Sequence, residues 1–532
     1  MIKSTMNPDL FYQPTGVACH RVCVRTILGM AVVTAALFST NTYAGRFTLG
    51  DEVKGTWNNT LKYSLGVRTS DPNPYALANT NTDDTDNNFE KGSLIMNRGD
   101  WLSELTMRYR NFGLSLSGSV LYDDVYNRTN DNDSTTNNAY SVAADEFTDD
   151  TKDWSGKRAE LLNAYVSGQF TPGDIPVSVR IGRHTMLWGE SLFFTDNGIA
   201  ATMAPVDAAK ALSVPNTKAQ ELFLPVNQIT ASALLGGGWT VEGFYQLEWE
   251  KTRIPPVGSY MSSADMLDFG GERIDAGSGA YFYRSHDDEP NAPQFGVSAR
   301  WRPADLNLDL GFYAVRYNDK TPQVRVTPSG GFDPATGSIG TYNLEYQENI
   351  KLYGISSNST FGQLNVGSEI SYRQGIPLGE LNVLGDTLHA QMSAIYVGRA
   401  GALWDAFSVA GEVAGHQLVK ATRNGDQRPD EDDDHALGMR GVMTMDYYQL
   451  APSLDVQVPI GLGYNVAGKS PVAGAFNNYG SHQGGDISLG ITGIYQYDWK
   501  AGLNYTHFFG AEDQNYYSGR DFLMVSITRT FQ

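Results

Sequence analysis

One stretch of the chain matches a chemical motif in both residue type and spacing. Gly463 to Ser470 reads GYNVAGKS and fits the phosphate-binding pattern GxxxxGK(S/T). A working phosphate loop joins a buried strand to a helix whose N-terminus holds the phosphate. Here Pro471 follows directly, and residues 472–478 show no helical period. The sequence therefore argues against nucleotide binding.

Other catalytic patterns are missing from the sequence. The eight histidines are scattered, and neither an HExxH motif nor a GxSxG motif occurs. A hydrolase built from Ser, His and Asp on a barrel rim stays an alternative, because pairing His184, His389 or His416 with such neighbours requires the fold. We expect no enzyme, no catalytic residue and no cofactor.

Carboxylates gather in two short runs, at 83–88 (DDTDNN) and at 430–434 (DEDDD). Hard divalent cations prefer oxygen ligands, so these runs are candidates for cation binding at a lipopolysaccharide surface. The alternative is a solvated loop. The first run begins like an EF-hand, but Phe89 occupies the required Gly position and Ile95 the required Glu position, so we expect no EF-hand.

The composition favours strands and turns over helices. The 532 residues include 56 Gly and 29 Tyr, and the formal net charge is −20. Only 39 residues are Lys or Arg, too few for a protein that binds nucleic acid by neutralising phosphates. The two cysteines, Cys19 and Cys23, cannot form a disulfide framework.

The first 44 residues have the order of a secretory signal peptide. A basic start precedes an apolar run at 27–38, and small residues lead to Ala44. The run is about a dozen residues long, which is too short to span a bilayer. We predict a signal peptide over 1–44 and one folded domain over 45–532, with an N-terminal membrane anchor as the alternative.

The domain alternates apolar and polar residues with period two, as two-faced strands do. In 53–68, for example, Trp57, Leu61 and Leu65 share one face, opposite Lys54 and Lys62. That run is longer than the average soluble strand and long enough to cross a bilayer at a tilt. Eighteen such runs are found, at 53–68, 100–110, 112–124, 158–170, 176–187, 228–235, 239–251, 293–302, 306–318, 346–359, 363–373, 386–397, 403–418, 436–448, 454–466, 485–497, 499–508 and 520–531.

The connections tend to alternate between short and long. Bacterial outer-membrane barrels have short periplasmic turns, long external loops and an even number of strands. We therefore predict an all-β fold: a single transmembrane antiparallel up-and-down β-barrel of about 18 strands, within 16–20. A soluble β-helix or a secreted protein of several sandwiches is the alternative.

The connection at 188–227 is rich in Ala, Leu, Phe and Pro. Exposing so much apolar surface to water is unfavourable, so we predict that this loop folds into the barrel and narrows it, with short helical turns at 207–212 and 217–222. An ordered external cap is the alternative. The candidate constriction residues are Trp188, Gly189, Glu190, Pro205, Asp207, Lys210 and Pro225.

The strand alternation also directs charged side chains of both signs inward. They can pair across strands and fill space, or form a ladder that selects a charged solute. The candidate lumen-lining residues are Arg180, His184, Glu242, Glu248, Arg300, Arg373 and Arg440.

Several motifs resemble those of a known family. They are Arg180 to His184 (RIGRH), Trp188 to Ser191 (WGES), and the segments PVD at 205–207 and LPV at 224–226. The family is a proteobacterial outer-membrane group known as a domain of unknown function. The resemblance covers nearly the whole mature chain and implies an outer-membrane barrel, no agreed active site, and uptake of hydrophobic compounds by some members. Ala204 stands where an asparagine is common, so any role of that asparagine is in doubt here.

We predict a channel in the outer membrane of a Gram-negative bacterium that passes hydrophobic or amphipathic small molecules. A general or carboxylate-selective porin is the first alternative, and a filled-barrel surface or assembly protein is the second. The expected partners are the lipid bilayer, lipopolysaccharide and the barrel-assembly machinery, and the resemblance adds a periplasmic lipid-binding-like protein.

Overall fold

A computed structural model describes residues 45–134, 137–214, 222–428, 433–472, 483–515 and 517–531, without the side chains of residues 380 and 381. The described residues all belong to one compact unit of the chain. The predicted signal peptide at 1–44, most of the predicted turn at 217–222 and part of the acidic run at 430–434 lie outside the described residues.

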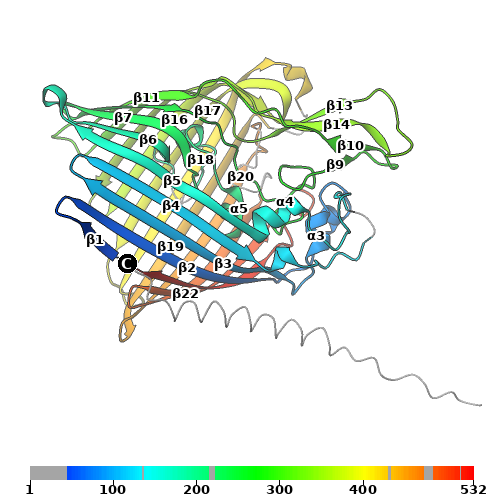
Figure 1. Cartoon of the computed structure of the whole chain (residues 1–532), viewed down its shortest axis with the longest axis horizontal. Helices are drawn as coiled ribbons and strands as arrows, with labels where there is room; N and C mark the ends of the chain where they lie inside the picture. The colour runs from blue at the N-terminus through cyan, green and yellow to red at the C-terminus, as the bar shows by residue number, and fades with distance from the viewer. Residues whose placement is uncertain are drawn as a thin grey trace, which may run out of the picture. The chain divides into compact units, whose positions relative to one another are not determined.

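Long antiparallel strands dominate the described residues and close into a barrel (Figure 1). Eighteen of the 19 strands in its sheet each pair with the next, and β23 closes the ring on β2, from Asn59 opposite Phe531 to Arg68 opposite Phe522. The prediction of an 18-strand barrel is confirmed. These strands are β2 (Val53–Arg68), β3 (Leu94–Tyr109), β4 (Phe112–Asp123), β5 (Lys157–Phe170), β6 (Val177–His184), β7 (Val226–Gly236), β8 (Trp239–Gln246), β11 (Phe295–Trp301), β12 (Asp309–Tyr317), β15 (Ile350–Phe361), β16 (Leu364–Leu378), β17 (Glu380–Gly398), β18 (Ala406–Arg423), β19 (His435–Ala451), β20 (Leu454–Ala467), β21 (Gly485–Tyr495), β22 (Trp499–Phe509) and β23 (Phe522–Phe531).

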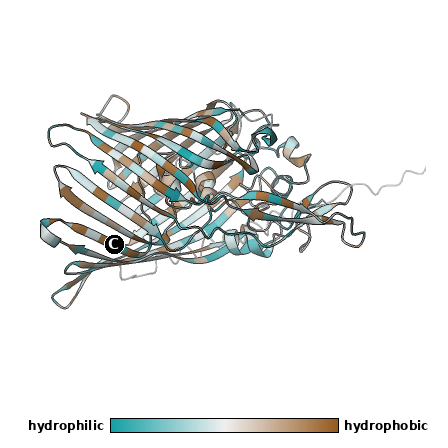
Figure 2. Ribbon diagram, turned by 90° about the horizontal axis from the view of Figure 1, so that it is seen from above, coloured by the Kyte–Doolittle hydropathy of each residue, from teal (hydrophilic) through white to brown (hydrophobic). Residues whose placement is uncertain are grey.

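The barrel strands carry apolar side chains outward. In β21, Leu489 and Ile491 are 49% and 48% exposed, whereas the intervening inward residues are polar or small, and Ser488 is buried. Figure 2 shows the same alternation of hydrophobic and hydrophilic bands along the strands. An apolar outer face of this kind suits contact with lipid and not with water. Exposed aromatic side chains lie near the short connections, at Tyr109, Phe112, Phe170, Trp239, Phe361, Tyr396, Tyr448 and Tyr495.

Short and long connections lie at opposite ends of the barrel. Two-residue turns such as 110–111 and 237–238 lie at one end, and the connections 69–93, 124–156 and 247–294 lie at the other. One connection departs from this rule, since β16 and β17 are joined at the long-loop end by Gly379 alone. Its positive φ of 70° is readily adopted by glycine.

The long connections contain a second sheet that the sequence patterns did not predict. It consists of β9 (Arg273–Asp275), β10 (Tyr281–Arg284), β13 (Gln323–Pro328) and β14 (Ser338–Glu345). Both segments, 252–292 and 319–345, were expected to be loops. Each segment forms one antiparallel pair, β9 with β10 and β13 with β14. β9 and β10 are only three and four residues long, and the parallel pairing of β10 with β14 joins the two segments, so local patterns do not predict this sheet.

Shorter elements complete the described residues. β1 (Gly45–Leu49) pairs with β2 beyond the end of β23, at the short-turn end. No helix in the described part of the chain is long and apolar enough to cross a membrane. The helices are α2 (Pro74–Leu77), α3 (Asp84–Asn88), η1 (Val125–Asn127), α4 (Asp149–Thr151), η2 (Lys152–Gly156), η3 (Pro172–Asp174), η4 (Ile199–Thr202), α5 (Ala208–Ser213) and η6 (Gly425–Gln427).

Candidate functional site

The segment 185–225, here called the lumen loop, joins β6 to β7 and lies against the inner face of the barrel. Two glutamates from β16 and β18, the two neighbours of β17, hold its backbone. Glu412 on β18 accepts from the amides of Leu192 at 3.2 Å and Phe194 at 2.9 Å. Glu369 on β16 accepts from the amides of Glu190 at 2.7 Å and Ile199 at 2.8 Å. The prediction that this loop enters the lumen is confirmed.

An arginine and two histidines hold the same part of the loop. Arg373 donates to the carbonyl oxygens of Asn197 at 2.7 Å and Gly198 at 3.0 Å. The side-chain oxygen of Asn197 lies 2.9 Å from Nδ1 of His389 and 3.2 Å from Nδ1 of His416. Both imidazoles thus contact the side chain of Asn197 and help to hold this part of the loop.

The apolar side chains of the lumen loop face another part of the barrel wall. Trp188, Ile199 and Met203 are buried in a cluster with Phe244, Tyr313, Val315, Tyr317, Ile350 and Leu352. The indole Nε1 of Trp188 donates to Glu242 at 2.8 Å. Burying these groups removes apolar surface from water and explains why so apolar a connection turns inward.

The glycine of the WGES motif, Gly189, has a steric role. Gly189 has a φ of 94°, and a Cβ there would meet the carboxylate of Glu369. A larger residue would therefore displace the contact that fixes the Glu190 amide.

The candidate constriction residues separate into two groups. Asp207, Lys210 and Pro225 line an open cavity. Trp188, Gly189, Glu190 and Pro205 instead pack in the lumen loop or against the wall, and Pro205 accepts from the amide of Leu224 at 2.8 Å.

The predicted helical turn at 207–212 is present as α5. Asp207 caps it by accepting from the amide of Lys210 at 2.9 Å.

The lumen loop leaves an upper cavity of about 780 Å³ along the wall formed by β2 to β6. Its volume is typical of a small-molecule site. Aromatic and other apolar side chains, most of them from the long connections, cover its outer part, and charged side chains from the strands, the lumen loop and the connection 247–294 line the rest. The apolar group includes Tyr126, Trp154, Pro255, Tyr260, Met261, Phe269 and Phe522, and the charged group is Lys62, Arg98, Arg158, Arg180, Lys210, Arg253, Asp100, Asp123, Glu160 and Asp207.

Most charges in the upper cavity are paired with one another. Arg98 donates to Asp100 at 2.7 Å, and Arg253 donates to Glu160 at 2.6 Å. Lys62 and Arg180 differ, because neither makes a hydrogen bond or ion pair with any described residue. The guanidinium of Arg180 lies 5.9 Å from the Tyr165 ring centre, a cation–π contact. Two cations are thus left facing the cavity.

A lower cavity of about 620 Å³ lies at the short-turn end of the same wall. Its charged lining consists of Arg46, Lys54, Arg108 and Arg110, with no carboxylate among the described lining residues. Tyr165 lines both cavities and so lies between them. The inner wall is therefore basic from one cavity to the next, in a chain whose net charge is −20.

The remaining candidate lumen residues are engaged in pairs. Arg300 contacts Asp309 at 2.7 Å and Glu190 at 3.6 Å. Arg440 pairs with Asp486. These arrangements match structural pairing across strands, the first of the two roles considered for such residues.

His184 and Glu248 also have close partners. His184 is buried, with its Nε2 3.0 Å from the Thr230 hydroxyl. Glu248 lies beyond the end of β8 and accepts from Arg183 at 2.8 Å.

Sequence reasoning missed several cavity residues. The pairing of β4 with β5 shifts between Leu116 and Gly118. Beyond this shift the inward and outward positions of β5 are exchanged, and Tyr165 therefore faces inward. Such a bulge leaves no mark in a period-two pattern. Arg98 was placed in a long loop, whereas β3 begins at Leu94.

The phosphate-loop motif is not a nucleotide site. Its first residues, 463–467, belong to strand β20, and no helix begins in the described residues up to Val472. The Ser470 hydroxyl contacts Nε2 of His416 at 2.9 Å.

Three solved structures resemble the barrel distantly. Acinetobacter baumannii OccAB1 is 8% identical, with a TM-score of 0.42 over 90% of this chain and 96% of that chain. Pseudomonas aeruginosa OccK2 (OpdF), in complex with glucuronate, is 10% identical, with a TM-score of 0.40 over 90% and 98%. Pseudomonas aeruginosa OpdK with vanillate is 10% identical, with a TM-score of 0.40 over 91% and 100%. The strand pairings described above establish the barrel independently of these likenesses.

No curated protein matches the sequence. The family model described as a protein of unknown function, DUF1302, matches residues 25–531. This match spans the motifs at 180–191 as well as the barrel strands. The chain therefore belongs to the DUF1302 family.

Proposed function

We propose that this protein is an outer-membrane channel for amphipathic organic anions, small molecules that join a carboxylate-like group to an apolar body. The closed barrel, its apolar outer face and its long loops at one end support insertion in the outer membrane of a Gram-negative bacterium. The barrel-assembly machinery and lipopolysaccharide are the partners that such a location requires.

The unpaired cations Lys62 and Arg180 carry the proposal. They line the upper cavity, while Lys54 and Arg108 continue the basic wall into the lower cavity. A cation in a confined space of low polarity raises the local concentration of anions. An anion crossing the barrel therefore meets successive positive groups along β2 to β6.

The apolar side chains that cover the upper cavity select for the apolar body of the solute. Tyr260, Phe269 and Phe522 face the same cavity as Lys62. Small-molecule sites commonly combine an apolar lining with a few placed polar groups. A solute with a charged group and an apolar body satisfies both parts of this lining.

The lumen loop favours this selective channel over the alternatives. A general porin needs an open aqueous pore, and here the loop is bound across the wall of β16 to β18. A completely filled barrel would leave no cavities of about 780 and 620 Å³. Uptake of neutral hydrophobic compounds accounts for the apolar cover but not for the unpaired cations.

Planar-bilayer recording tests the proposal. We expect an anion-preferring conductance that 3-phenylpropionate reduces from either side, because the probe occupies the upper cavity. Its neutral amide is the matched control and should reduce the current at least about tenfold less, since one ionic contact is worth more than 1.4 kcal/mol in a confined site. Equal block by the two probes, or a cation-preferring pore, would contradict the proposal.

A further inference from the structure

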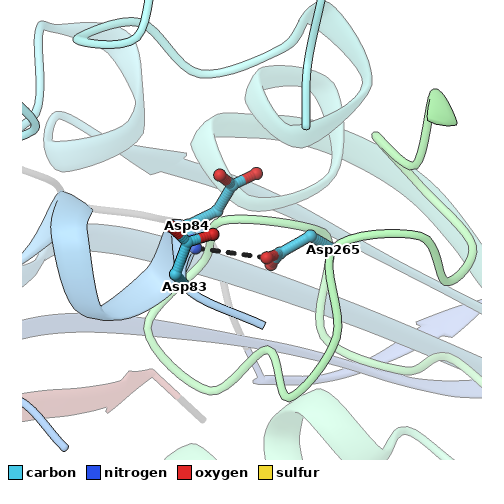
Figure 3. A group of neighbouring side chains, drawn as sticks. All are labelled: Asp83, Asp84 and Asp265. Carbon is cyan, nitrogen blue, oxygen red and sulfur yellow. Dashed lines mark hydrogen bonds between the residues drawn. The ribbon is translucent and has the colours of Figure 1, made fainter. Parts of the chain in front are cut away.

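Three aspartates from two external connections lie together at the long-loop end. Asp83 and Asp84 stand at the start of α3, and Asp265 comes from the connection between β8 and β9 (Figure 3). One carboxylate oxygen from each lies within 4.8 Å of the other two. The cluster lies in the external connections, apart from the cavity residues on which the transport proposal rests.

This cluster is buried and makes no ion pair with the described residues, although Arg273 acts electrostatically on Asp84 and Arg520 on Asp265. Asp83, Asp84 and Asp265 are 6%, 4% and 1% exposed. No described Lys, Arg or His nitrogen lies within the 4.0 Å ion-pair distance of any of them. Asp86 is different, because it lies between the guanidinium groups of Arg68 and Arg520 at 2.5 and 2.9 Å. Buried charges without a partner are strongly unfavourable.

One oxygen of the cluster has no hydrogen-bond partner among the residues that the structure describes. Oδ2 of Asp265 accepts from the backbone amide of Asp84 at 3.2 Å, but Oδ1 is buried and accepts no hydrogen bond from the described residues. Figure 3 shows this carboxylate turned toward Asp83 and Asp84. A buried acceptor that lacks a donor and faces two other carboxylates indicates a missing positive ligand.

We propose that Asp83, Asp84 and Asp265 bind one divalent cation such as calcium, which fastens the connection 69–93 to the connection 247–294. Calcium takes oxygen ligands at about 2.3–2.6 Å, so ligands on opposite sides of the ion are separated by roughly 4.6–5.2 Å. The ligand oxygens of the cluster, one from each carboxylate, all lie within 4.8 Å of one another, close enough to share one ion of this kind.

Proton binding is the competing way to relieve the same repulsion. Burial raises the pKa of Asp83 to about 6 and that of Asp84 to about 7, and it raises the pKa of Asp265 as well. A protonated cluster would bind no cation near neutral pH. The two accounts therefore differ in a measurable quantity, the calcium bound at pH 7.5.

Isothermal titration of the folded mature chain in detergent, after EGTA treatment and dialysis, tests the proposal with CaCl₂ as the probe. We expect one site per chain. Asp265→Asn keeps the side-chain shape but removes a charge, and should weaken binding by at least about tenfold. Asp71→Asn is the control, because Asp71 lies in the same connection with its side chain 78% exposed. It should bind calcium like the wild type.

Folding of each variant is checked by its heat-modifiable gel mobility, and Asp84→Asn serves if Asp265→Asn fails to fold. Limited proteolysis supplies a second readout, since calcium should slow cleavage within 69–93 and 247–294 in the wild type only. Calcium bound by residual lipopolysaccharide would be equal in wild type and variants. Equal titrations of wild type and Asp265→Asn, or no binding by the wild type at pH 7.5, would overturn the proposal.

Discussion

The carboxylate of Glu412 accepts a hydrogen bond from the backbone amide of Phe194 at 2.9 Å. Glu412 belongs to barrel strand β18, and Phe194 to the lumen loop. A single inward-facing side chain thus fixes main-chain atoms more than two hundred positions away in sequence. Together with Glu369 it keeps the loop on one side of the barrel and leaves the basic wall free.

Removing these anchors should open the barrel. In Glu369→Ala/Glu412→Ala, several loop amides lose a charged acceptor, and each such hydrogen bond is worth about 1.5–3 kcal/mol. We expect single-channel conductance in planar bilayers to rise by about twofold or more as the loop detaches. Glu512→Ala, in an external connection, is the control and should leave the conductance unchanged. Unaltered conductance in the double variant would mean that other contacts hold the loop.

Tyr165 should limit passage between the two cavities. It lines both of them, so Tyr165→Ala widens the route at that point. We expect 3-phenylpropionate to enter proteoliposomes roughly twofold faster or more through this variant, while chloride flux changes less, because the bulkier solute gains more from added width. Tyr353→Ala, on the lipid-facing side and 52% exposed, provides the comparison. Equal acceleration of both solutes would count against a gate at Tyr165.

The ion triad at the long-loop end should be important for stability. Asp86 joins Arg68 and Arg520, and all three side chains are fully buried. Asp86→Asn leaves two buried guanidinium groups without a charged partner, a change that typically costs about 3–5 kcal/mol. The urea midpoint of unfolding, followed by heat-modifiable mobility, should fall accordingly. Asp71→Asn should not move it, and a comparable midpoint for Asp86→Asn would refute this assignment.

Lys320 should make the attachment of the lumen loop depend on pH. It is buried, and its Nζ donates to the carbonyl oxygen of Thr202 at 3.1 Å. Burial lowers the pKa of Lys320 to about 8, from an ordinary 10.5. The folded protein therefore releases this proton at lower pH than the unfolded chain, so the contribution of Lys320 makes stability rise between about pH 8 and about 10.5 and stay constant below pH 8.

Urea unfolding between pH 7.5 and 10.5 measures this dependence. The wild-type midpoint should increase over the range, and Lys320→Met, which cannot titrate, should lose that increase. Parallel pH profiles for the two proteins would show that another group is responsible.

The barrel could be predicted from sequence because its strands are long and each strand by itself alternates apolar and polar residues. All 18 predicted strands are present, and the apolar composition of 188–227 predicted its inward fold. The external sheet could not be predicted, since β9 has three residues and β10 pairs with β14 from a separate connection. Local patterns carry no information about such pairings.

The candidate site was predicted only in part, because its contacts join residues that are far apart in sequence. Alternation placed Arg180 and Glu242 inward, but which cations remain unpaired depends on partners from several strands. The reading of 83–88 as solvated loop is wrong for Asp84 and Asp86, which are buried. Their neighbours, Asp265 and Arg520, come from distant connections that only the closed barrel brings together.

The reversal potential in a KCl gradient tests the central claim most directly. The double variant Lys62→Met/Arg180→Met removes the two unpaired cations. Because the attraction of a passing anion to each unit charge is worth on the order of 1 kcal/mol, we expect the chloride-to-potassium permeability ratio to fall by roughly fivefold or more. Lys351→Met, a cation on the exposed outer face, should retain the wild-type ratio. An anion preference in the wild type that falls only in the double variant is the predicted result. An unchanged ratio in the double variant would contradict the account.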